Sequence, residues 1–278
     1  MPELAEVETV IRTLEHQLGN KRINSVDVYY DKMIDNMTST EFKDKLEGEI
    51  ILNYKRIGKY IVIETSHYNL VVHLRMEGKF YIMGSMDRIA KHTHVVLRLD
   101  GCSLHYNDTR KFGKMYLYDK AIPIMSTNAF KHVGLDVFDS LLDTTYLIKS
   151  ASKRSTSIKA FLLDQSVMAG VGNIYADEIC FACKLHPSTS LKALDDSDYE
   201  AILHHTRRIL KGAIKAGGTT IRSYTSSLGV SGRFQLELKV HSRENQACYV
   251  CNTTIKKIRV AGRGTSICLT CQKLKQPK

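Results

Sequence analysis

Four cysteines near the end of the chain restrict its fold more than any other feature of the sequence. Cys248 and Cys251 are separated by two residues, sixteen residues follow, and Cys268 and Cys271 repeat the two-residue separation. Two tight turns of this kind each supply a pair of thiolates to a tetrahedral ion, which is the pattern of structural zinc sites. Because four thiolates leave no position open for water, the sequence predicts one structural Zn²⁺ that folds a small module and takes no part in catalysis.

Three further cysteines, Cys102, Cys180 and Cys183, lie outside this pattern. Cys180 and Cys183 also have the two-residue separation, but they accompany apolar residues in a helical pattern, so buried packing is the favoured interpretation. The first residues lack the basic and apolar segments of a signal peptide, and no apolar run approaches the roughly 20 residues of a membrane span. We therefore expect a protein of the bacterial cytosol, associated with the nucleoid and not with a membrane.

The balance of charge favours a polyanionic partner. The 278 residues carry a formal charge of +11, and the isoelectric point is about 9.2. The excess is uneven, because residues 239–278 contain nine lysines or arginines and one acid, a formal +8. Several of these cations lie between the two cysteine pairs, on an expected hairpin tip where phosphates could bind. Nucleic acid is the leading candidate among polyanions.

Hydrophobic periodicity separates a mixed first part of the chain from a helical second part. Residues 3–18 show helical spacing of apolar side chains, whereas residues 23–118 form short alternating or β-branched runs punctuated by glycines. The second pattern is typical of an antiparallel β-sandwich, and we expect the first helix to pack against it. Helical periodicity returns from residue 158 to residue 217, after a segment of poor periodicity, and a Gly- and Ser-rich stretch follows.

The first residues suggest a nucleophile. If Met1 is removed, Pro2 presents a secondary α-amine, which with a pKa of roughly 8 is partly unprotonated at neutral pH and can form a Schiff base with an aldehyde-like carbon. Glu3 and Glu6 share one face of the helix that Pro2 begins, so one can donate a proton while the other orients the amine. Ordinary helix capping also explains these residues, and for this segment taken alone capping is the favoured interpretation.

Six motifs in one order extend the comparison to the whole chain. They are Pro2-Glu-Leu-Ala-Glu-Val-Glu8, Arg56-Ile-Gly-Lys-Tyr60, His73-Leu-Arg-Met-Glu-Gly78, Asn107-Asp-Thr-Arg-Lys-Phe-Gly113, Ala169-Gly-Val-Gly-Asn-Ile-Tyr175 and the four-cysteine module. Together they closely resemble the formamidopyrimidine-DNA glycosylases, a family of bifunctional DNA glycosylases and abasic-site lyases.

The resemblance implies an α+β fold in which an N-terminal β-sandwich flanked by helices is followed by a helix-two-turn-helix domain and the zinc finger. We expect a catalytic sandwich over residues 1–133, a linker over 134–152, a helix-two-turn-helix domain with a lesion-capping loop over 153–235, and the finger over 236–278. A monomer is expected to bind double-stranded DNA that contains oxidised bases or abasic sites, between the two domains.

The resemblance also implies a mechanism. Pro2 attacks C1′ of the damaged nucleoside, the base leaves, and β- and δ-eliminations break both flanking phosphodiester bonds. Glu3 corresponds to the acid that assists opening of the sugar ring, Glu6 to a supporting carboxylate, and Lys59 to a catalytic lysine that contacts the phosphate beside the lesion. Arg263 joins these catalytic residues.

Further residues are implied in DNA binding, since an enzyme that acts on a base must extrude it from the stack. Met76, Arg110 and Phe112 correspond to a triad inserted into the duplex, with two apolar wedges and an arginine that faces the orphaned base. His73, Asn173 and Arg263 correspond to phosphate contacts. The implied lesion pocket consists of Glu77, Thr219, Thr220, Arg222 and Tyr224.

Two positions depart from the family pattern. Ala5 stands where a second proline is usual, and His241-Ser242 replaces a Tyr-Gly pair before the finger. Two alternatives also remain open: an endonuclease VIII-like enzyme for oxidised pyrimidines, and a non-catalytic sensor of damaged DNA. Leu4 and the complete triad favour the purine-specific branch, and the combination of amine and carboxylates favours an enzyme over a sensor.

Overall fold

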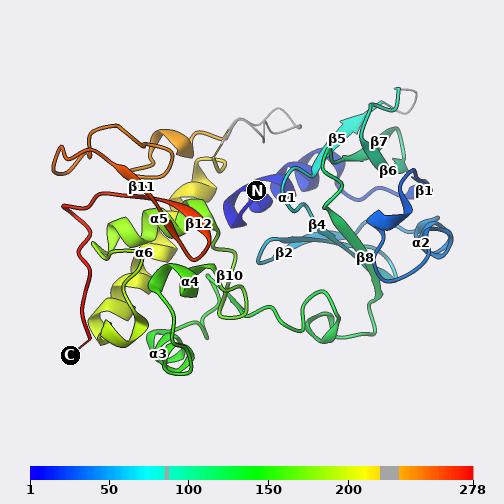
Figure 1. The fold of residues 1–278 in the computed structure, drawn as a ribbon. Helices are drawn as coiled ribbons and strands as arrows, with labels where there is room; N and C mark the ends of the chain where they lie inside the picture. Colours follow the sequence, from blue (N-terminus) through cyan, green and yellow to red (C-terminus); the bar gives the residue numbers. More distant parts are fainter. Residues whose placement is uncertain (85–87, 220–231, 278) are drawn as a thin grey trace. The chain divides into compact units, whose positions relative to one another are not determined.

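A computed structural model of the chain describes residues 1–84, 88–219 and 232–277 (Figure 1). The chain divides into two compact units. Unit 1 comprises Met1–Lys131 and Gly217–Gly232, and unit 2 comprises His132–Ala216 and Arg233–Lys278. Each unit is described by itself.

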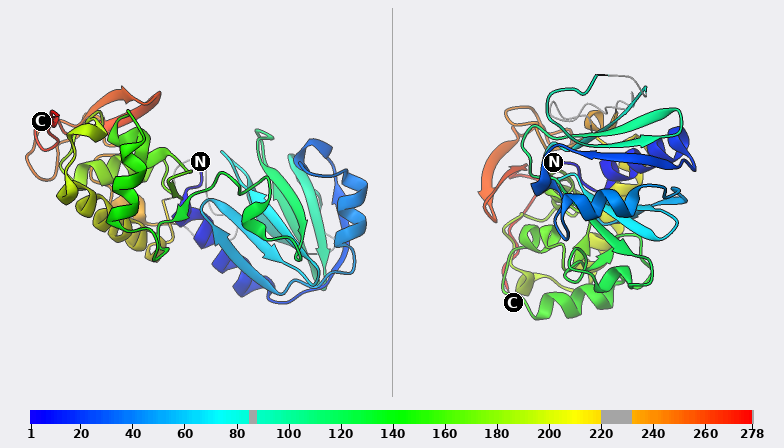
Figure 2. Two further views of the ribbon diagram at one scale, coloured as in Figure 1. Left: turned by 90° about the horizontal axis from the view of Figure 1, so that it is seen from below. Right: turned by 90° about the vertical axis from the view of Figure 1, so that its right-hand side faces the viewer.

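Unit 1 is built on two four-stranded antiparallel sheets. Its helices and strands are α1 (Leu4–Leu18), β1 (Ile23–Val28), η1 (Asp31–Met33), α2 (Ser39–Leu46), β2 (Asn53–Ile57), β3 (Tyr60–Glu64), β4 (Tyr68–His73), β5 (Lys79–Met83), β6 (Thr93–Leu99), β7 (Cys102–Asn107), β8 (Lys114–Asp119) and η2 (Ile124–Ser126). One sheet has the order β1-β6-β7-β5 and the other the order β2-β3-β4-β8. The sheets lie face to face (Figure 2), which confirms the expected β-sandwich.

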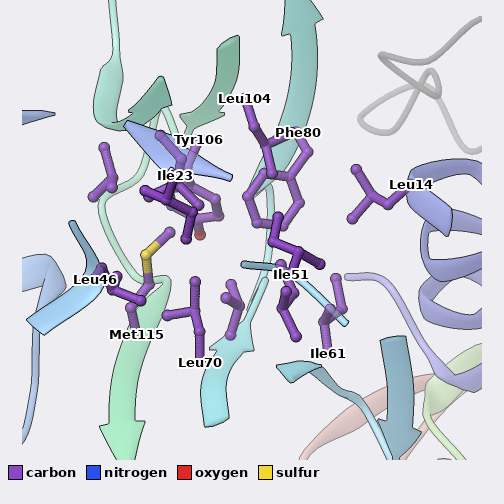
Figure 3. Close-up of a cluster of buried hydrophobic side chains, with 14 of the residues drawn as sticks. Leu14, Ile23, Leu46, Ile51, Ile61, Leu70, Phe80, Leu104, Tyr106 and Met115 are labelled. Atoms are coloured by element: carbon purple, nitrogen blue, oxygen red, sulfur yellow. The ribbon is translucent and has the colours of Figure 1, made fainter. Parts of the chain in front are cut away.

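The core of unit 1 lies between the sheets and under the two helices. Figure 3 shows side chains from both sheets meeting there, among them Phe80, Tyr106 and Met115. The apolar face of α1 packs on β2 and β3, and this face is the one that the helical spacing of residues 3–18 predicts. At about 25 cal/mol per Å² of apolar area removed from water, this shared core is the main favourable term in the stability of the unit.

Helix α2 was not predicted from the sequence. α2 covers only eight residues, and Phe42 and Leu46 are its buried side chains, so hydrophobic periodicity gives a weak signal. A capping box between Thr38 and Glu41 defines its start. That Thr-x-x-Glu spacing is readable in the sequence and was the signal available for this helix.

The topology brings two loops to the same end of the sandwich. The chain crosses from one sheet to the other between β4 and β5, and crosses back between β7 and β8. His73 at the end of β4 pairs with Lys114 at the start of β8, and Lys79 at the start of β5 pairs with Asn107 at the end of β7. These two registers place the crossovers side by side.

Unit 2 is helical with a C-terminal hairpin. Its elements are β9 (Leu135–Asp136), α3 (Thr144–Ser152), α4 (Ile158–Leu163), β10 (Met168–Ala169), α5 (Asn173–Ala182), η3 (Leu191–Ala193), α6 (Asp196–Lys215), η4 (Phe234–Leu236), β11 (Lys256–Val260) and β12 (Arg263–Ile267). The helical periodicity of residues 158–217 is confirmed by α4, α5 and α6. Cys180 is fully buried on α5, and burial raises the pKa of Cys183 to about 12, so both thiols are packing groups.

The division of the chain differs from the expected boundaries in two places. The segment 134–152, expected as a linker, contains β9 and α3 and is part of unit 2. It was overlooked because only Leu147 and Ala151 of α3 are buried. Residues 217–219, expected with the helical domain, group with unit 1, where Thr219 binds Glu6. Among the described residues, no helix is both long and apolar enough to cross a membrane.

Candidate active site and nucleic-acid interface

The N-terminal turn of α1 is buried and held by its own carboxylates. Pro2, Glu3 and Glu6 are all buried, and Glu3 and Glu6 form a capping box in which the Glu3 N–H donates to Glu6 Oε2 at 2.9 Å. Burial of two carboxyl groups requires such partners, because an uncompensated buried charge is costly. The box fixes the first turn of the helix, and hence the place of Pro2, although Ala5 is not a proline.

The second oxygen of Glu6 binds Thr219, which lies where the chain rejoins unit 1 after α6. Glu6 Oε1 accepts hydrogen bonds from the Thr219 N–H at 2.7 Å and from Thr219 Oγ1 at 3.0 Å. Gly218 has a φ of +76°, and a Cβ there would lie 2.8 Å from Glu6 Oε1. Glycine is therefore required for this close approach, and Thr219 is placed against Glu6 at the start of the expected lesion-capping loop.

Lys59 lies in the tight turn between β2 and β3. Gly58 occupies the first central position with a φ of +57°, a conformation that glycine adopts without a steric cost. Arg56 Nη1 donates to the Gly58 carbonyl at 3.1 Å, and Arg56 Nε donates to Glu8 Oε2 at 2.9 Å. The arginine thus ties the turn to α1, and Lys59 is held with only 6% of its surface exposed.

His73 is a neutral imidazole at the end of β4. Burial, together with the nearby charges of Arg75 and Lys59, lowers the pKa of His73 to about 3. Its Nδ1 accepts the Arg75 N–H at 3.0 Å, so the ring proton resides on Nε2. The edge-to-face contact with Tyr60, at 4.5 Å between centroids, fixes the ring. A neutral N–H donor of this kind can bind a phosphate oxygen at any pH near neutrality.

The expected triad lies on the two adjacent crossover loops. Met76 and Phe112 are large apolar side chains left 36% and 51% exposed. The Arg110 guanidinium lies over the Phe112 ring at 4.8 Å. Exposed apolar side chains beside an arginine at one end of a sandwich can enter a nucleic-acid stack more readily than they can serve a core.

A buried carboxylate shapes the second of these loops. Asp108 is fully buried, and its oxygens accept the Arg110 N–H at 3.0 Å and the Gly113 N–H at 2.8 Å. Lys111, between them, adopts a φ of +58°. Asp108 was not predicted as a functional residue from the sequence, although an aspartate that bonds the backbone two residues ahead is a common turn former.

The expected pocket residues are only partly described. The Glu77 carboxylate accepts a hydrogen bond from Thr109 Oγ1 across the two loops, and Thr219 binds Glu6. Thr220, Arg222 and Tyr224 lie outside the described residues.

In unit 2 the structure brings together the two expected phosphate contacts. Asn173 begins α5, and its Nδ2 donates to the Gly264 carbonyl at 3.0 Å. Gly264 follows Arg263, which is exposed at the start of β12. The hairpin turn before it, Ala261-Gly262, has positive φ at both residues, as a two-residue turn between twisted strands requires.

A buried network that sequence reasoning missed anchors this hairpin. Lys159 Nζ donates to Asp177 Oδ1 at 2.6 Å and to Thr265 Oγ1 at 2.5 Å, and both charged side chains are fully buried. His241 Nδ1 lies 2.7 Å from Asp177 Oδ2, which shows where the unusual histidine binds. No local signal could reveal a network whose members are so far apart in the sequence.

The four expected metal ligands meet in one cluster. The sulfur atoms of Cys248, Cys251, Cys268 and Cys271 lie within 4.8 Å of one another. Neighbouring sulfurs are 3.9 Å and 3.3 Å apart, close to the roughly 3.8 Å edge of a tetrahedron with 2.3 Å zinc–sulfur bonds. Backbone N–H groups of Val250 and Cys271 point at the sulfurs. The residues fit a structural zinc ion, as the spacing predicts.

Comparisons with known proteins agree along the whole chain. Family models match residues 1–115 (Formamidopyrimidine-DNA glycosylase N-terminal domain), 133–225 (Formamidopyrimidine-DNA glycosylase H2TH domain) and 245–274 (Zinc finger found in FPG and IleRS). The chain is 42% identical over 274 residues to the formamidopyrimidine-DNA glycosylase of Bacillus cereus, covering 98% of this chain and 99% of the relative. It is 43% identical over 276 residues to that of Exiguobacterium sibiricum, covering 99% of both chains.

Solved structures agree as well. The wild-type Lactococcus lactis Fpg (MutM) in complex with DNA containing N7-benzyl-Fapy-dG matches with a TM-score of 0.91 and 35% identity, covering 98% of this chain and all of that one. The same protein in complex with abasic-site DNA matches with a TM-score of 0.91 and 34% identity, covering 98% and 99%. The chain therefore belongs to the formamidopyrimidine-DNA glycosylase family, the base excision repair glycosylases that also act as abasic-site lyases.

Proposed function

We propose that this protein excises oxidised purines, namely 8-oxoguanine and formamidopyrimidines, from double-stranded DNA and then cleaves the strand at the abasic site. It acts as a monomer in the bacterial cytoplasm. The observation that carries the proposal is the buried first turn of α1, where Glu3 and Glu6 form a box directly beside Pro2. The relatives' names and their complexes with Fapy-dG and abasic DNA support the substrate class.

Pro2 supplies the nucleophile once Met1 is removed. The lone pair of the secondary amine attacks C1′, and the bond from C1′ to the base breaks with its electron pair leaving on the base, which takes up a proton. The amine then loses its proton while Glu3 protonates the ring oxygen, so that the sugar opens to an iminium. Loss of a C2′ proton expels the 3′ phosphate, and a further elimination expels the 5′ phosphate.

The other carboxylate and the lysine have different tasks. Both oxygens of Glu6 already accept hydrogen bonds, one from Glu3 and the other from Thr219. Glu6 therefore acts by holding the first turn of α1 and Thr219 in place. Lys59, held in its turn by Arg56, contributes a positive charge for the phosphate beside the lesion.

DNA binding uses donors for phosphate and wedges for the base stack. In unit 1, the Nε2–H of His73 binds a phosphate, while Met76 and Phe112 enter the stack and Arg110 faces the orphaned base. In unit 2, Asn173 and Arg263 bind phosphates, and Arg263 also supports the reaction at the lesion. Cys248, Cys251, Cys268 and Cys271 would hold a structural zinc ion, which when bound would stabilise the fold of the hairpin that carries Arg263, while the reaction would use the protein's own side chains.

Borohydride trapping on an 8-oxoguanine duplex tests the proposal, because reduction converts an iminium into a stable protein–DNA bond. Wild type should form a crosslink that maps to Pro2, while Pro2→Gly should lower trapping strongly and Glu3→Gln should lower base release. Lys211→Gln, an exposed position on α6, serves as the control for lost charge. Mass spectrometry of the same sample verifies that Met1 is absent.

Two outcomes would contradict the proposal in different ways. Binding without a crosslink or a strand break on any lesion would indicate a sensor of damaged DNA. Excision from a thymine glycol duplex in preference to 8-oxoguanine would instead indicate the endonuclease VIII-like specificity.

A further inference from the structure

Two crossover loops at one end of the sandwich are exposed at their tips but are joined to each other by a side-chain hydrogen bond. The Met76 loop (residues 74–78) links β4 to β5, and the Phe112 loop (residues 108–113) links β7 to β8. Each carries at its tip part of the exposed apolar and cationic surface described above. The residues between the loops determine how far apart the tips lie.

The Tyr106 side chain lies next to Gly78 in the Met76 loop and Gly113 in the Phe112 loop. This side chain, on β7, is fully buried and packs edge-to-face on Phe80 at 5.4 Å between centroids. A Cβ at Gly78 would lie 2.2 Å from the Tyr106 hydroxyl oxygen, and one at Gly113 would lie 1.7 Å from it. Neither glycine has a positive φ, so the space around it, and not its backbone conformation, requires glycine. Tyr106 occupies that space at both positions, and at Gly78 the Leu74 carbonyl oxygen would also lie 2.6 Å from the added Cβ.

A side-chain hydrogen bond also joins the two loops. Thr109 Oγ1 in the Phe112 loop donates to Glu77 Oε2 in the Met76 loop. Within each loop the backbone is also held, by the Gly78 N–H to the Leu74 carbonyl at 2.9 Å and by the Asp108 carboxylate. Each loop is therefore held by its own hydrogen bonds, one side-chain hydrogen bond joins the two loops, and the Tyr106 side chain fills the space next to both glycines.

We propose that Tyr106, Thr109 and Glu77 are positioning residues that hold the two loops as one preformed wedge for the DNA stack. The inference rests on the proposed function and assigns Glu77 to the wedge instead of the lesion pocket. A wedge ordered before binding does not lose loop and side-chain freedom when it enters the duplex, so base extrusion becomes faster. Loosening the tie should slow extrusion without touching the amine chemistry at Pro2.

Thr109→Val and Tyr106→Phe test the tie, each by removing a single hydroxyl. On a lesion duplex with 2-aminopurine beside the damaged base, we expect Thr109→Val to slow the rise in fluorescence that reports unstacking by about three- to tenfold, because it loses the hydrogen bond to Glu77. Tyr106→Phe should slow it as well, because the space next to Gly78 and Gly113 is no longer filled. Base excision under single-turnover conditions should slow by the same factor as unstacking. Iminium trapping on a single-stranded abasic oligonucleotide, which needs no wedge, should be unchanged.

Matched controls and a rescue make the result specific. Thr145→Val on α3 and Tyr54→Phe, whose hydroxyl donates to the Gly19 carbonyl at 3.3 Å, remove the same groups elsewhere and should leave unstacking unchanged. Gly113→Ala should impair unstacking severely. Adding Tyr106→Phe should restore part of it, since the nearest remaining atom to the new Cβ, Tyr106 Cζ, is 2.8 Å away instead of 1.7 Å.

The outcomes separate this inference from the proposed function. If wild type excises bases and Thr109→Val and Tyr106→Phe match it in unstacking and excision, the loops are not a tied wedge and the inference is wrong. Equal losses on the duplex and on the single-stranded abasic substrate would also overturn it. If wild type unstacks the duplex but excises nothing, the proposed function fails while the unstacking comparison still decides the role of the tie. Thr109 is exposed, so its variant is expected to fold even if Gly113→Ala does not.

Discussion

Replacing Lys159 by methionine should destabilise unit 2 more than any exposed lysine substitution. Lys159 Nζ lies 2.6 Å from Asp177 Oδ1, and both side chains are fully buried. The methionine keeps the approximate length of the side chain but leaves the Asp177 carboxylate with His241 and the Ser266 N–H, at 2.7 Å and 3.2 Å. Removing one member of a buried ion pair costs about 3–5 kcal/mol, because the remaining charge stays desolvated.

This loss corresponds to a large shift in melting temperature. For a domain of this size, 1 kcal/mol corresponds to roughly 3–4 °C, so Lys159→Met should lower the Tm of the transition of unit 2 by about 9–20 °C. Differential scanning calorimetry of the zinc-loaded protein measures it. Lys257→Met is the matched control, since Lys257 pairs with Glu244 at 3.4 Å with 56% of its side chain exposed, and should shift the Tm by less than about 2 °C.

A double variant tests the physical reason. Lys159→Met combined with Asp177→Leu removes both charges, so it should recover a large part of the loss even though it changes more of the buried site. A shift below about 3 °C for Lys159→Met would refute the reasoning. So would a double variant less stable than the single one, because the cost would then come from packing and not from the uncompensated carboxylate.

Three other predictions concern His73, the zinc site and Glu6. The pKa of His73 is about 3 in the folded chain and about 6.5 in the unfolded chain. Between these two values only the unfolded chain binds the proton, so the free energy of unfolding falls by about 1.4 kcal/mol per pH unit as the pH decreases from 6.5 toward 3. Urea unfolding at pH 7 and pH 5 should show a smaller loss for His73→Gln than for wild type, and equal losses would contradict the assignment. Removing zinc with a chelator, or by Cys251→Ala, should unfold the finger hairpin and weaken duplex binding at least tenfold, as measured by gel shift. Iminium trapping on single-stranded abasic DNA should persist. Unchanged duplex binding would argue against the finger as a DNA contact. Glu6→Gln offers one acceptor oxygen in place of two, so it should cost about 1–3 kcal/mol of stability and lower trapping at Pro2 more than Glu8→Gln does, as measured by urea unfolding and borohydride trapping.

The fold was largely predictable where the signals are local. The spacing of Leu4, Val7 and Val10 identifies α1, and the alternating runs identify the strands of the sandwich. α2 and α3 escaped because each buries only two side chains in a short helix, which leaves little periodicity to detect. Sheet order was not readable from the runs, because strands that follow each other in the chain, such as β4 and β5, belong to different sheets.

The candidate site was predictable as a set of residues but not as a set of contacts. The motifs point to Pro2, Glu3 and Lys59, whose chemical roles stay predictions. The binding of Glu6 to Thr219 joins residues 213 positions apart in the sequence, and no motif reports it. The place of Glu77 in the lesion pocket likewise stays a prediction, and no motif reports that its carboxylate accepts a hydrogen bond from Thr109 on the neighbouring loop.

What the sequence determined by itself is a set of residues and their spacing: two cysteine pairs that fit zinc, a proline beside two carboxylates, and an excess of positive charge in the last forty residues. These features depend on spacings of a few residues, over which turns and helices fix geometry directly. Only the tertiary structure decided that Lys159 neutralises Asp177 and that Tyr106 fills the space at Gly78 and Gly113. Such contacts arise because core packing brings distant segments within a few ångströms of each other, and no local spacing in the sequence encodes that distance.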